Sequence, residues 1–208
     1  LNEPIILDGP YSNSAFDIVC KNDKVYMIIG GKDLLNGKRF DKGGYILTYD
    51  YDKWSFIDPK EAQKKLNLPR NPRDYTSIAV TTDDSNDEIV YASSMGDGVI
   101  QYKNGTPVQS YNEKNAFKET AGGYGSGYCY IDGLAFDKNG NLWMTSSEVK
   151  HAVLVLDKAG AWHRLDIEQL RGVYTINDIL ITSTNDKWIY VPRNTPKLVI
   201  IPNSESLD

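Results

Sequence analysis

Short apolar runs separated by turn residues recur along the chain, and this pattern predicts β-strands. In the clearest example, the runs Leu134–Phe136 and Leu142–Met144 flank a turn at 137–141 that contains Asn139-Gly140. Asn-Gly between apolar runs is a strong hairpin signal because both residues tolerate positive φ. We therefore expect a β-hairpin, with the Trp143 side chain buried between neighbouring sheets.

Three further segments repeat this hairpin pattern, at residues 16–27, 76–92 and 177–191. Each hairpin is followed by another β-like run, at 45–49, 98–102, 152–156 and 197–201. After the first three there is also a shorter, more polar run, at 54–57, 107–111 and 162–165. Units of four strands whose polarity rises from the first strand to the last are typical of propeller blades.

The spacing of the repeats supports the same fold. The aromatic residues Tyr26, Tyr91, Trp143 and Tyr190 are separated by 65, 52 and 47 residues, close to the ~40 to 50 residues of propeller repeats. We therefore predict an all-β protein, a β-propeller with four blade-like repeats of four antiparallel strands. The expected blades cover about residues 11–58, 74–112, 130–166 and 174–201.

The segment from Gly133 to Ser146 reads Gly-Leu-Ala-Phe-Asp-Lys-Asn-Gly-Asn-Leu-Trp-Met-Thr-Ser. It resembles the repeat of the two-component regulator propeller family, which occurs in sensor regions of Bacteroidetes hybrid histidine kinases and in related surface propellers of the PorZ type. The resemblance implies a non-catalytic binding or scaffold module of a cell-envelope protein, in the periplasm or at the cell surface. It also implies that the four blades belong to a larger ring of about seven.

The two ends of the repeat region leave one question open. The fourth unit has three strands, and residues 3–8 resemble an isolated outer strand. Either Ile5–Leu7 pairs with Lys197–Ile201 and closes a four-bladed ring, or residues 3–8 belong to a preceding blade of a larger ring. We favour the larger ring. An open arc exposes the apolar flanks of its terminal blades, so we expect self-association or a missing partner.

The composition indicates a globular chain and disfavours several kinds of partner. The chain has 208 residues, of which 40% are hydrophobic and 25% charged, enough for a sizeable core. Its longest apolar runs have four or five residues, far fewer than the ~18 of a membrane-spanning helix. A formal net charge of −5 with scattered basic residues disfavours a nucleic-acid partner and an anionic substrate.

The connections between units carry their own signals. Residues 58–66 predict a short helix, because Asp58 can cap it and Pro59 suits its first position. Residues 166–172 repeat this pattern, with Gly172 as the stop. The connection 112–130 is rich in glycine instead. In a propeller all three connections would lie at one mouth of the central channel.

Little in the sequence indicates catalysis or metal binding. His151 and His163 have no second ligand at a metal-binding spacing, so we expect no metal site, no cofactor and no catalytic histidine. Asp137 belongs to a turn that lacks the later glutamate of a calcium loop. Cys20 and Cys129 occupy unrelated repeat positions, which favours free thiols over a disulfide.

Tyrosines in the glycine-rich connection suggest a ligand site, because their rigid amphipathic rings suit sugars and peptides. The alternative is that these rings only cover the channel mouth. The candidate ligand-binding residues are Tyr124, Tyr128, Tyr130, Asp132, Asn177 and Asp178.

The carboxylates at the starts of the inner strands allow a second function. Asp17, Asp132 and Asp178 could serve a propeller hydrolase or lyase that acts on a glycan. The favoured interpretation is that they accept hydrogen bonds from backbone amides where the blades converge.

Overall fold

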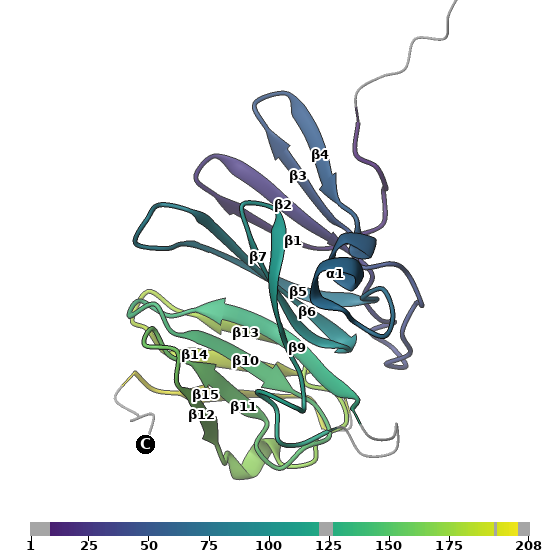
Figure 1. The fold of residues 1–208 in the computed structure, drawn as a ribbon. Helices are drawn as coiled ribbons and strands as arrows, with labels where there is room; N and C mark the ends of the chain where they lie inside the picture. The colour runs from purple at the N-terminus through teal and green to yellow at the C-terminus, as the bar shows by residue number, and fades with distance from the viewer. Residues whose placement is uncertain (1–8, 121–126, 194, 204–208) are drawn as a thin grey trace, which may run out of the picture.

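The computed structural model describes residues 9–120, 127–193 and 195–203, and antiparallel sheet dominates them (Figure 1). The first blade contains β1 (Ala15–Lys21), β2 (Lys24–Ile29), β3 (Ile46–Asp50) and β4 (Lys53–Ile57). The second contains β5 (Tyr75–Thr82), β6 (Glu88–Gly96), β7 (Gly98–Lys103) and β8 (Thr106–Tyr111). The third contains β9 (Cys129–Phe136), β10 (Leu142–Ser146), β11 (Val153–Leu156) and β12 (Trp162–Leu165). The fourth contains β13 (Asp178–Ile181), β14 (Lys187–Val191) and β15 (Lys197–Ile201).

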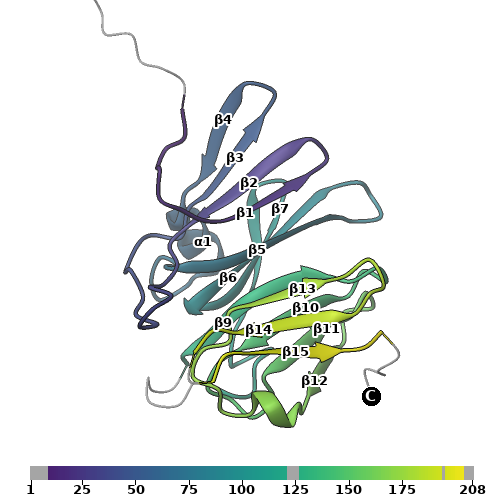
Figure 2. The same ribbon diagram turned by 180° about the vertical axis from the view of Figure 1, so that it is seen from behind.

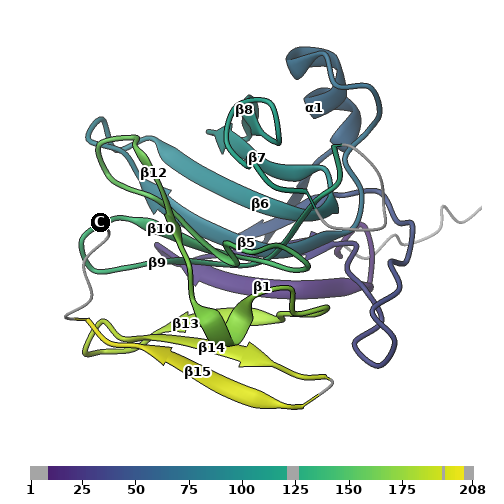
Figure 3. The same cartoon turned by 90° about the horizontal axis from the view of Figure 1, so that it is seen from below.

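Within each blade, consecutive strands pair in chain order from the inside outward. The sheets lie side by side like the leaves of a fan, with the first blade at one end and the third and fourth blades overlapping at the other in these views (Figures 1 and 2). The inner strands β1, β5, β9 and β13 contact one another in sequence, and Figure 3 shows them gathered toward the middle. A short pairing of Met95 with Tyr130 joins the second and third blades. The predicted propeller fold is therefore confirmed.

Within the described residues the fourth sheet has three strands, β13 to β15. The outer strand expected at residues 3–8 lies outside those residues, and so do both interpretations of its pairing.

The hydrophobic core lies between the blades. We call the face of a blade that packs against the next blade in the chain its forward face, and the opposite one its back face. Alternation along a strand sends neighbouring side chains to opposite faces. In the third blade Trp143 therefore points forward against Ile179 and Ile189, while Met144 points back toward Tyr91.

The prediction that Trp143 is buried between blades is confirmed, since only 2% of its surface is exposed. Its Nε1 donates to Asp137 Oδ2 over 2.9 Å, and Lys187 Nζ of the fourth blade lies 4.5 Å from the ring centre. Asp137 Oδ1 also accepts from the backbone N–H of Asn141 over 2.9 Å. The Asp137 carboxylate thus fixes the hairpin turn and orients the ring above it, the turn function expected from the sequence.

The pairing register corrects one residue of the repeat. Trp143 pairs with Ala135, and Trp188 pairs with Leu180 at the same place in the fourth hairpin. The repeated forward aromatic position is therefore Trp188 and not Tyr190. The turns of these two hairpins have the same length, residues 137–141 and 182–186, and β14 carries two aromatic residues, of which the first is the equivalent one.

One of the two predicted helices is present as expected. Helix α1 (Pro59–Leu66) begins at Asp58, whose carboxylate accepts from Lys60 N, and ends at Asn67 in the left-handed conformation. The expected helix at 166–172 is wrong. It is a single 3₁₀ turn, η1 (Glu168–Leu170), because the Asp166 carboxylate binds the Arg171 guanidinium at 2.5 and 2.9 Å instead of capping a helix. No helix in the described residues is long and apolar enough to cross a membrane.

Both cysteines are free thiols. Cys20 is exposed on the back face of the first blade, and Cys129 is buried at the start of β9. Burial raises the pKa of the Cys129 thiol to about 12, so this thiol is inert at neutral pH.

Candidate functional site at the channel mouth

A long connection between β2 and β3 extends over the inner ends of the other blades. We call residues 30–45 the crossing loop. Lys32 and Arg39 form an antiparallel bridge within it, and the turn between them is closed by Gly37 N donating to Asp33 O over 2.7 Å. Gly37 has φ 73°, and a Cβ there would lie 2.8 Å from Arg193 Nη1. The loop that starts in the first blade therefore reaches the fourth.

The second blade holds the crossing loop from below. The Asp74 carboxylate accepts from Asp41 N over 3.1 Å and from Lys42 N over 3.0 Å. Asp74 N also donates to Lys42 O over 2.9 Å. Asp74 is fully buried, and this burial raises the pKa of its carboxyl. The loop thus has a rigid attachment beside the hollow described below.

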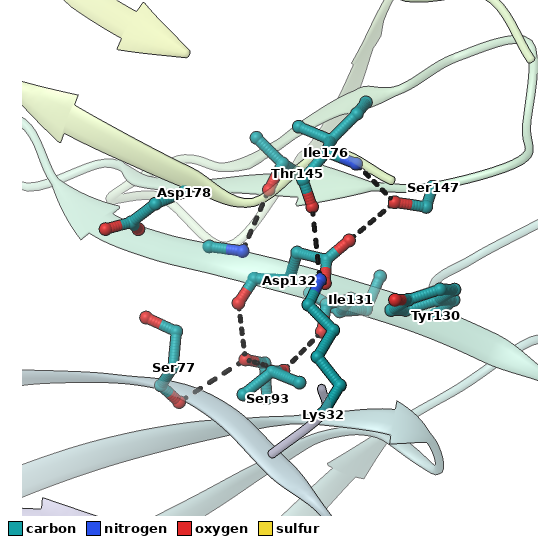
Figure 4. A network of polar contacts seen from close by, with 12 residues as sticks. Lys32, Ser77, Ser93, Tyr130, Ile131, Asp132, Thr145, Ser147, Ile176 and Asp178 are labelled. Carbon is teal, nitrogen blue, oxygen red and sulfur yellow. Dashed lines mark hydrogen bonds and ion pairs between the residues drawn. The ribbon is translucent and has the colours of Figure 1, made fainter. Parts of the chain in front are cut away.

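A buried ion pair joins the crossing loop to the third blade (Figure 4). Lys32 Nζ donates to Asp132 Oδ1, and the two side chains are 1% and 0% exposed. The same Nζ lies 3.5 Å from Ile176 O and 5.0 Å from the centre of the Tyr130 ring. One lysine therefore links the first blade to the third and to the approach to the fourth.

The other oxygen of Asp132 is also bound. Ser147 Oγ donates to Asp132 Oδ2 over 2.5 Å and accepts from Ile176 N over 2.8 Å. Burial raises the pKa of Asp132 to about 6, although Lys32 and Ser147 favour the charged form. At neutral pH Asp132 is therefore an ionised carboxylate held in a closed network. It has no oxygen free to bind a ligand or to transfer a proton.

A cavity of about 490 Å³ lies beside the crossing loop, and we call it the mouth hollow. It is lined by residues of the crossing loop and of the connections between blades: Gly37, Lys38, Arg39, Asp41, Arg70, Met95, Tyr128 and Tyr174. The Arg70 guanidinium is held by Asp97 at 2.8 and 2.9 Å. Three cationic side chains and one carboxylate line the hollow, so the net charge of −5 does not describe its local charge.

Tyr128 separates the mouth hollow from a second hollow of about 470 Å³ that also contains Arg70, Glu113 and Lys114. Its ring packs on Gly96, where a Cβ would lie 2.8 Å from the ring. Its ring centre lies 6.4 Å from that of Tyr130, with the planes at 85°. Tyr128 is thus a fixed aromatic wall shared by both hollows.

The structure separates the six residues expected to bind a ligand. Tyr128 lines the mouth hollow, whereas Tyr130 and Asp132 are buried and do not line it. Asn177 is half-buried, and its backbone N–H donates to Tyr190 O over 2.9 Å. Asp178 is exposed at the start of β13. Tyr124 lies outside the described residues.

Sequence reasoning missed the rest of the mouth. Arg70 and Tyr174 lie in the two connections for which the sequence predicts only short helices. Lys32 and Arg39 lie in the crossing loop, for which the sequence pattern gives no prediction. The unusual length of this loop could have identified it as a candidate. Residues 30–45 connect β2 to β3, whereas the corresponding connection between β6 and β7 in the second blade is the single residue Asp97.

Two inner carboxylates, those of Asp17 and Asp178, lie outside the closed network around Asp132. Asp17 Oδ2 accepts from Ser77 Oγ and Ile78 N, each over 3.1 Å, so Asp17 binds the next blade as expected from the sequence. The pKa of Asp178 is raised to about 6, chiefly because the surrounding strands reduce the hydration of its carboxyl and then because of the negative charge of Asp17.

We predict that the carboxyl carbon of Asp178 titrates near pH 6 in a carbon-detected NMR experiment. The folded protein then holds this proton more tightly than the unfolded chain does. Asp178 therefore favours folding fully below its unfolded pKa of about 4, and this contribution is lost as the pH rises through about 6. Asp178→Asn should remove this titration and the share of the pH dependence of stability that Asp178 causes, while the share of Asp132, whose pKa is also raised to about 6, remains. A midpoint near 4 would contradict the prediction.

No protein family profile matches the sequence, and no curated protein matches it. Solved structures do match in shape. PorZ of Porphyromonas gingivalis, an essential bacterial surface component of the type-IX secretion system, aligns with a TM-score of 0.81 at 20% identity. The alignment covers 99% of this chain and 27% of PorZ.

Two other solved structures share the fold. The extracellular domain of the putative hybrid two-component system BT4673 from B. thetaiotaomicron aligns with a TM-score of 0.54 at 16% identity, over 92% of this chain and 25% of that one. A putative gluconolactonase aligns with a TM-score of 0.52 at 14% identity, over 90% of this chain and 58% of that one.

This chain thus spans about a quarter of the length of PorZ and of the BT4673 domain. The resemblance expected from the hairpin at 133–146 agrees with these matches. The chain is a β-propeller region similar in fold to PorZ and to the extracellular domains of Bacteroides hybrid two-component systems.

Proposed function

We propose that this chain is a non-catalytic binding or scaffold module of a cell-envelope protein, in the periplasm or at the cell surface, and that a glycan or peptide binds in the mouth hollow. The observation that carries the proposal is the convergence of Tyr128, Tyr174 and Arg39 from three separate connections around one cavity. The fold similarity to PorZ and to sensor ectodomains supports the cellular setting.

The chemistry of the hollow suits a polar ligand with flat faces. The Tyr174 ring is 40% exposed and carries the Arg193 guanidinium 5.5 Å from its centre. A sugar ring or a planar peptide group can pack on such a surface, while Arg39 and Lys38 donate hydrogen bonds to its oxygens. The fixed loop lowers the entropic cost of binding.

The test is to screen the purified chain on arrays of bacterial glycans and of short peptides, and then to measure the affinity of the retained compounds by calorimetry. We expect Tyr174→Ala and Arg39→Ala each to weaken binding at least ~10-fold, the loss typical of central aromatic and arginine contacts. Tyr51→Ala is the matched control, because Tyr51 is 81% exposed in the outer hairpin of the first blade. Unchanged affinity in both mouth variants would refute the proposal.

The second candidate is a propeller hydrolase or lyase that acts on a glycan through channel carboxylates. Two observations favour it: the raised pKa of Asp178 beside Asp17, and the fold shared with a putative gluconolactonase. The closed network around Asp132 counts against it, because one of the three carboxylates is then unable to take part. Product release that Asp178→Asn abolishes would favour this alternative.

A further inference from the structure

A cleft of about 480 Å³ lies between the first and second blades, and we call it the outer cleft. One wall comes from β2, β3 and β4 of the first blade, and the other from the start of β6 and the turn between β7 and β8 of the second. The outer cleft shares no described residue with the mouth hollow, so the two are separate cavities. Its lining includes Lys24, Thr48, Ser55, Ile57, Glu88 and Thr106.

Small side chains in the first blade leave room for this cleft. Tyr26 on β2 pairs with Thr48 on β3, and Thr48 pairs with Ser55 on β4, so the three side chains form one row on the forward face. The position of Ser55 carries larger side chains in the next two blades, Gln109 in the second and His163 in the third. The first row therefore ends in two adjacent hydroxyls with little bulk.

Aromatic rings fill the corresponding space between the second and third blades. Tyr111 Oη donates to Gln101 Oε1 over 2.9 Å, and the Tyr111 ring centre lies 5.4 Å from that of Trp162. At the first interface the pairing register places Ile57 at the position of Tyr111 and Pro107 at the position of Trp162. The two rings that close the later interface are thus replaced by smaller side chains where the outer cleft lies.

A paired lysine and glutamate supply the charges of the outer cleft. Glu88 Oε2 accepts from Lys24 Nζ over 2.8 Å and from Tyr26 Oη over 2.5 Å. The Lys24 and Glu88 side chains are 23% and 24% exposed, so both remain accessible. Among residues 9–120, 127–193 and 195–203, no donor reaches Glu88 Oε1. The ion pair therefore adds no net charge to the cleft but leaves one carboxylate oxygen that can accept.

Two hydroxyls line the same cleft. Thr48 Oγ1 and Ser55 Oγ lie 2.5 Å apart, so one donates to the other and the acceptor keeps a hydrogen that it can donate. Thr48 is buried and Ser55 is exposed, so Ser55 is the member of the pair that a ligand reaches first. The outer cleft thus offers both donors and acceptors while its charges balance.

We propose that the outer cleft binds a neutral sugar unit, as a second binding site separate from the mouth hollow. A sugar hydroxyl both donates and accepts, so it can donate to Glu88 Oε1 and accept from Lys24 Nζ, while a neighbouring hydroxyl meets Ser55 Oγ. A charged ligand fits less well, because one member of the ion pair would repel it. The volume lies within the ~300 to 1,000 Å³ of small-molecule sites. This inference does not depend on the ligand proposed for the mouth hollow.

The test is an NMR titration of the isotope-labelled 208-residue chain with glucose, galactose, mannose, N-acetylglucosamine and their disaccharides. We expect at least one of these sugars, at millimolar concentration, to shift the backbone amide signals of Thr48, Ser55 and Thr106. The amide signals of Arg39 and Tyr174 at the mouth hollow should stay in place during that titration. Shifts confined to the mouth hollow would support the ligand proposed there and overturn the outer cleft as a sugar site. The absence of shifts with every sugar would also overturn it.

Cleft variants test the assignment with the sugar that gives the largest shifts. Ser55→Trp should fill the cleft, and Glu88→Gln should remove the charged acceptor while keeping the side chain's shape, so each should weaken binding at least ~10-fold. Gln109→Trp is the matched control, because Gln109 is exposed at the position of Ser55 in the second blade. It should leave the affinity unchanged, and the amide spectrum of each variant shows whether the chain is folded. Unchanged affinity in both cleft variants, or equal weakening by Ser55→Trp and Gln109→Trp, would overturn the proposal.

Discussion

Replacing Lys32 with alanine is expected to lower the free energy of unfolding by ~3 to 5 kcal/mol, the usual loss when one partner of a buried ion pair is removed. The variant leaves the Asp132 carboxylate, 0% exposed, without its cation. It also removes the contacts of Nζ with Ile176 O and the Tyr130 ring. Urea denaturation followed by tryptophan fluorescence measures the loss.

Lys38→Ala is the matched control for this prediction. Lys38 belongs to the same crossing loop and is exposed, so its removal should change stability by less than ~0.5 kcal/mol. The double variant with Lys32→Met and Asp132→Leu should recover much of the loss, because it leaves no unpaired buried charge. Equal stability of the Lys32→Ala and Lys38→Ala variants would contradict the claim that the buried Lys32–Asp132 ion pair stabilises the fold.

Replacing Trp143 with alanine is expected to cost ~3 to 5 kcal/mol, as for other buried tryptophans. The ring fills the interface between the third and fourth blades and is held by Asp137 and Lys187. Thermal and urea denaturation should both show a large loss. A variant that melts within a degree or two of the parent would contradict the described packing.

The chain contains an internal control for Trp143. Trp188 occupies the same position in the next blade but is 40% exposed, so Trp188→Ala should cost only about 1 kcal/mol. Both variants remove the same side chain from the same strand position. The difference between their losses of unfolding free energy therefore measures the contribution of burial by a following blade. If self-association covers Trp188, the difference should shrink as protein concentration rises.

The strands could be predicted because their signals are local. Apolar alternation and turn residues at sites such as Asn139-Gly140 determine each hairpin within a few residues. Helix α1 was predictable for the same reason, since Asp58 and Pro59 adjoin it. The second helix failed because the sequence does not show that Asp166 prefers Arg171 to a capping contact.

The site was less predictable because its contacts join distant parts of the chain. Lys32 and Asp132 are 100 residues apart in the sequence. No local sequence pattern at either residue indicates that the two side chains form an ion pair. Asp132 was correctly assigned to an inner strand, although it is the fourth residue of β9 and not at its start. A strand position does not indicate whether a carboxylate will be free or closed off. Tyr128 could be found because aromatic residues in a glycine-rich connection are unusual, whereas no local pattern in the crossing loop points to Arg39.

The most direct test of the account compares binding and turnover on the same samples of the wild-type chain, Tyr174→Ala and Asp178→Asn. Each glycan or peptide retained in the array screen is incubated with the three proteins, its affinity is measured by calorimetry, and the mixture is analysed by mass spectrometry for products. The account predicts that the retained compound is recovered unchanged and that Tyr174→Ala weakens binding, whereas Asp178→Asn binds as the wild type does. A compound converted to product by the wild type and by Tyr174→Ala but not by Asp178→Asn would contradict it.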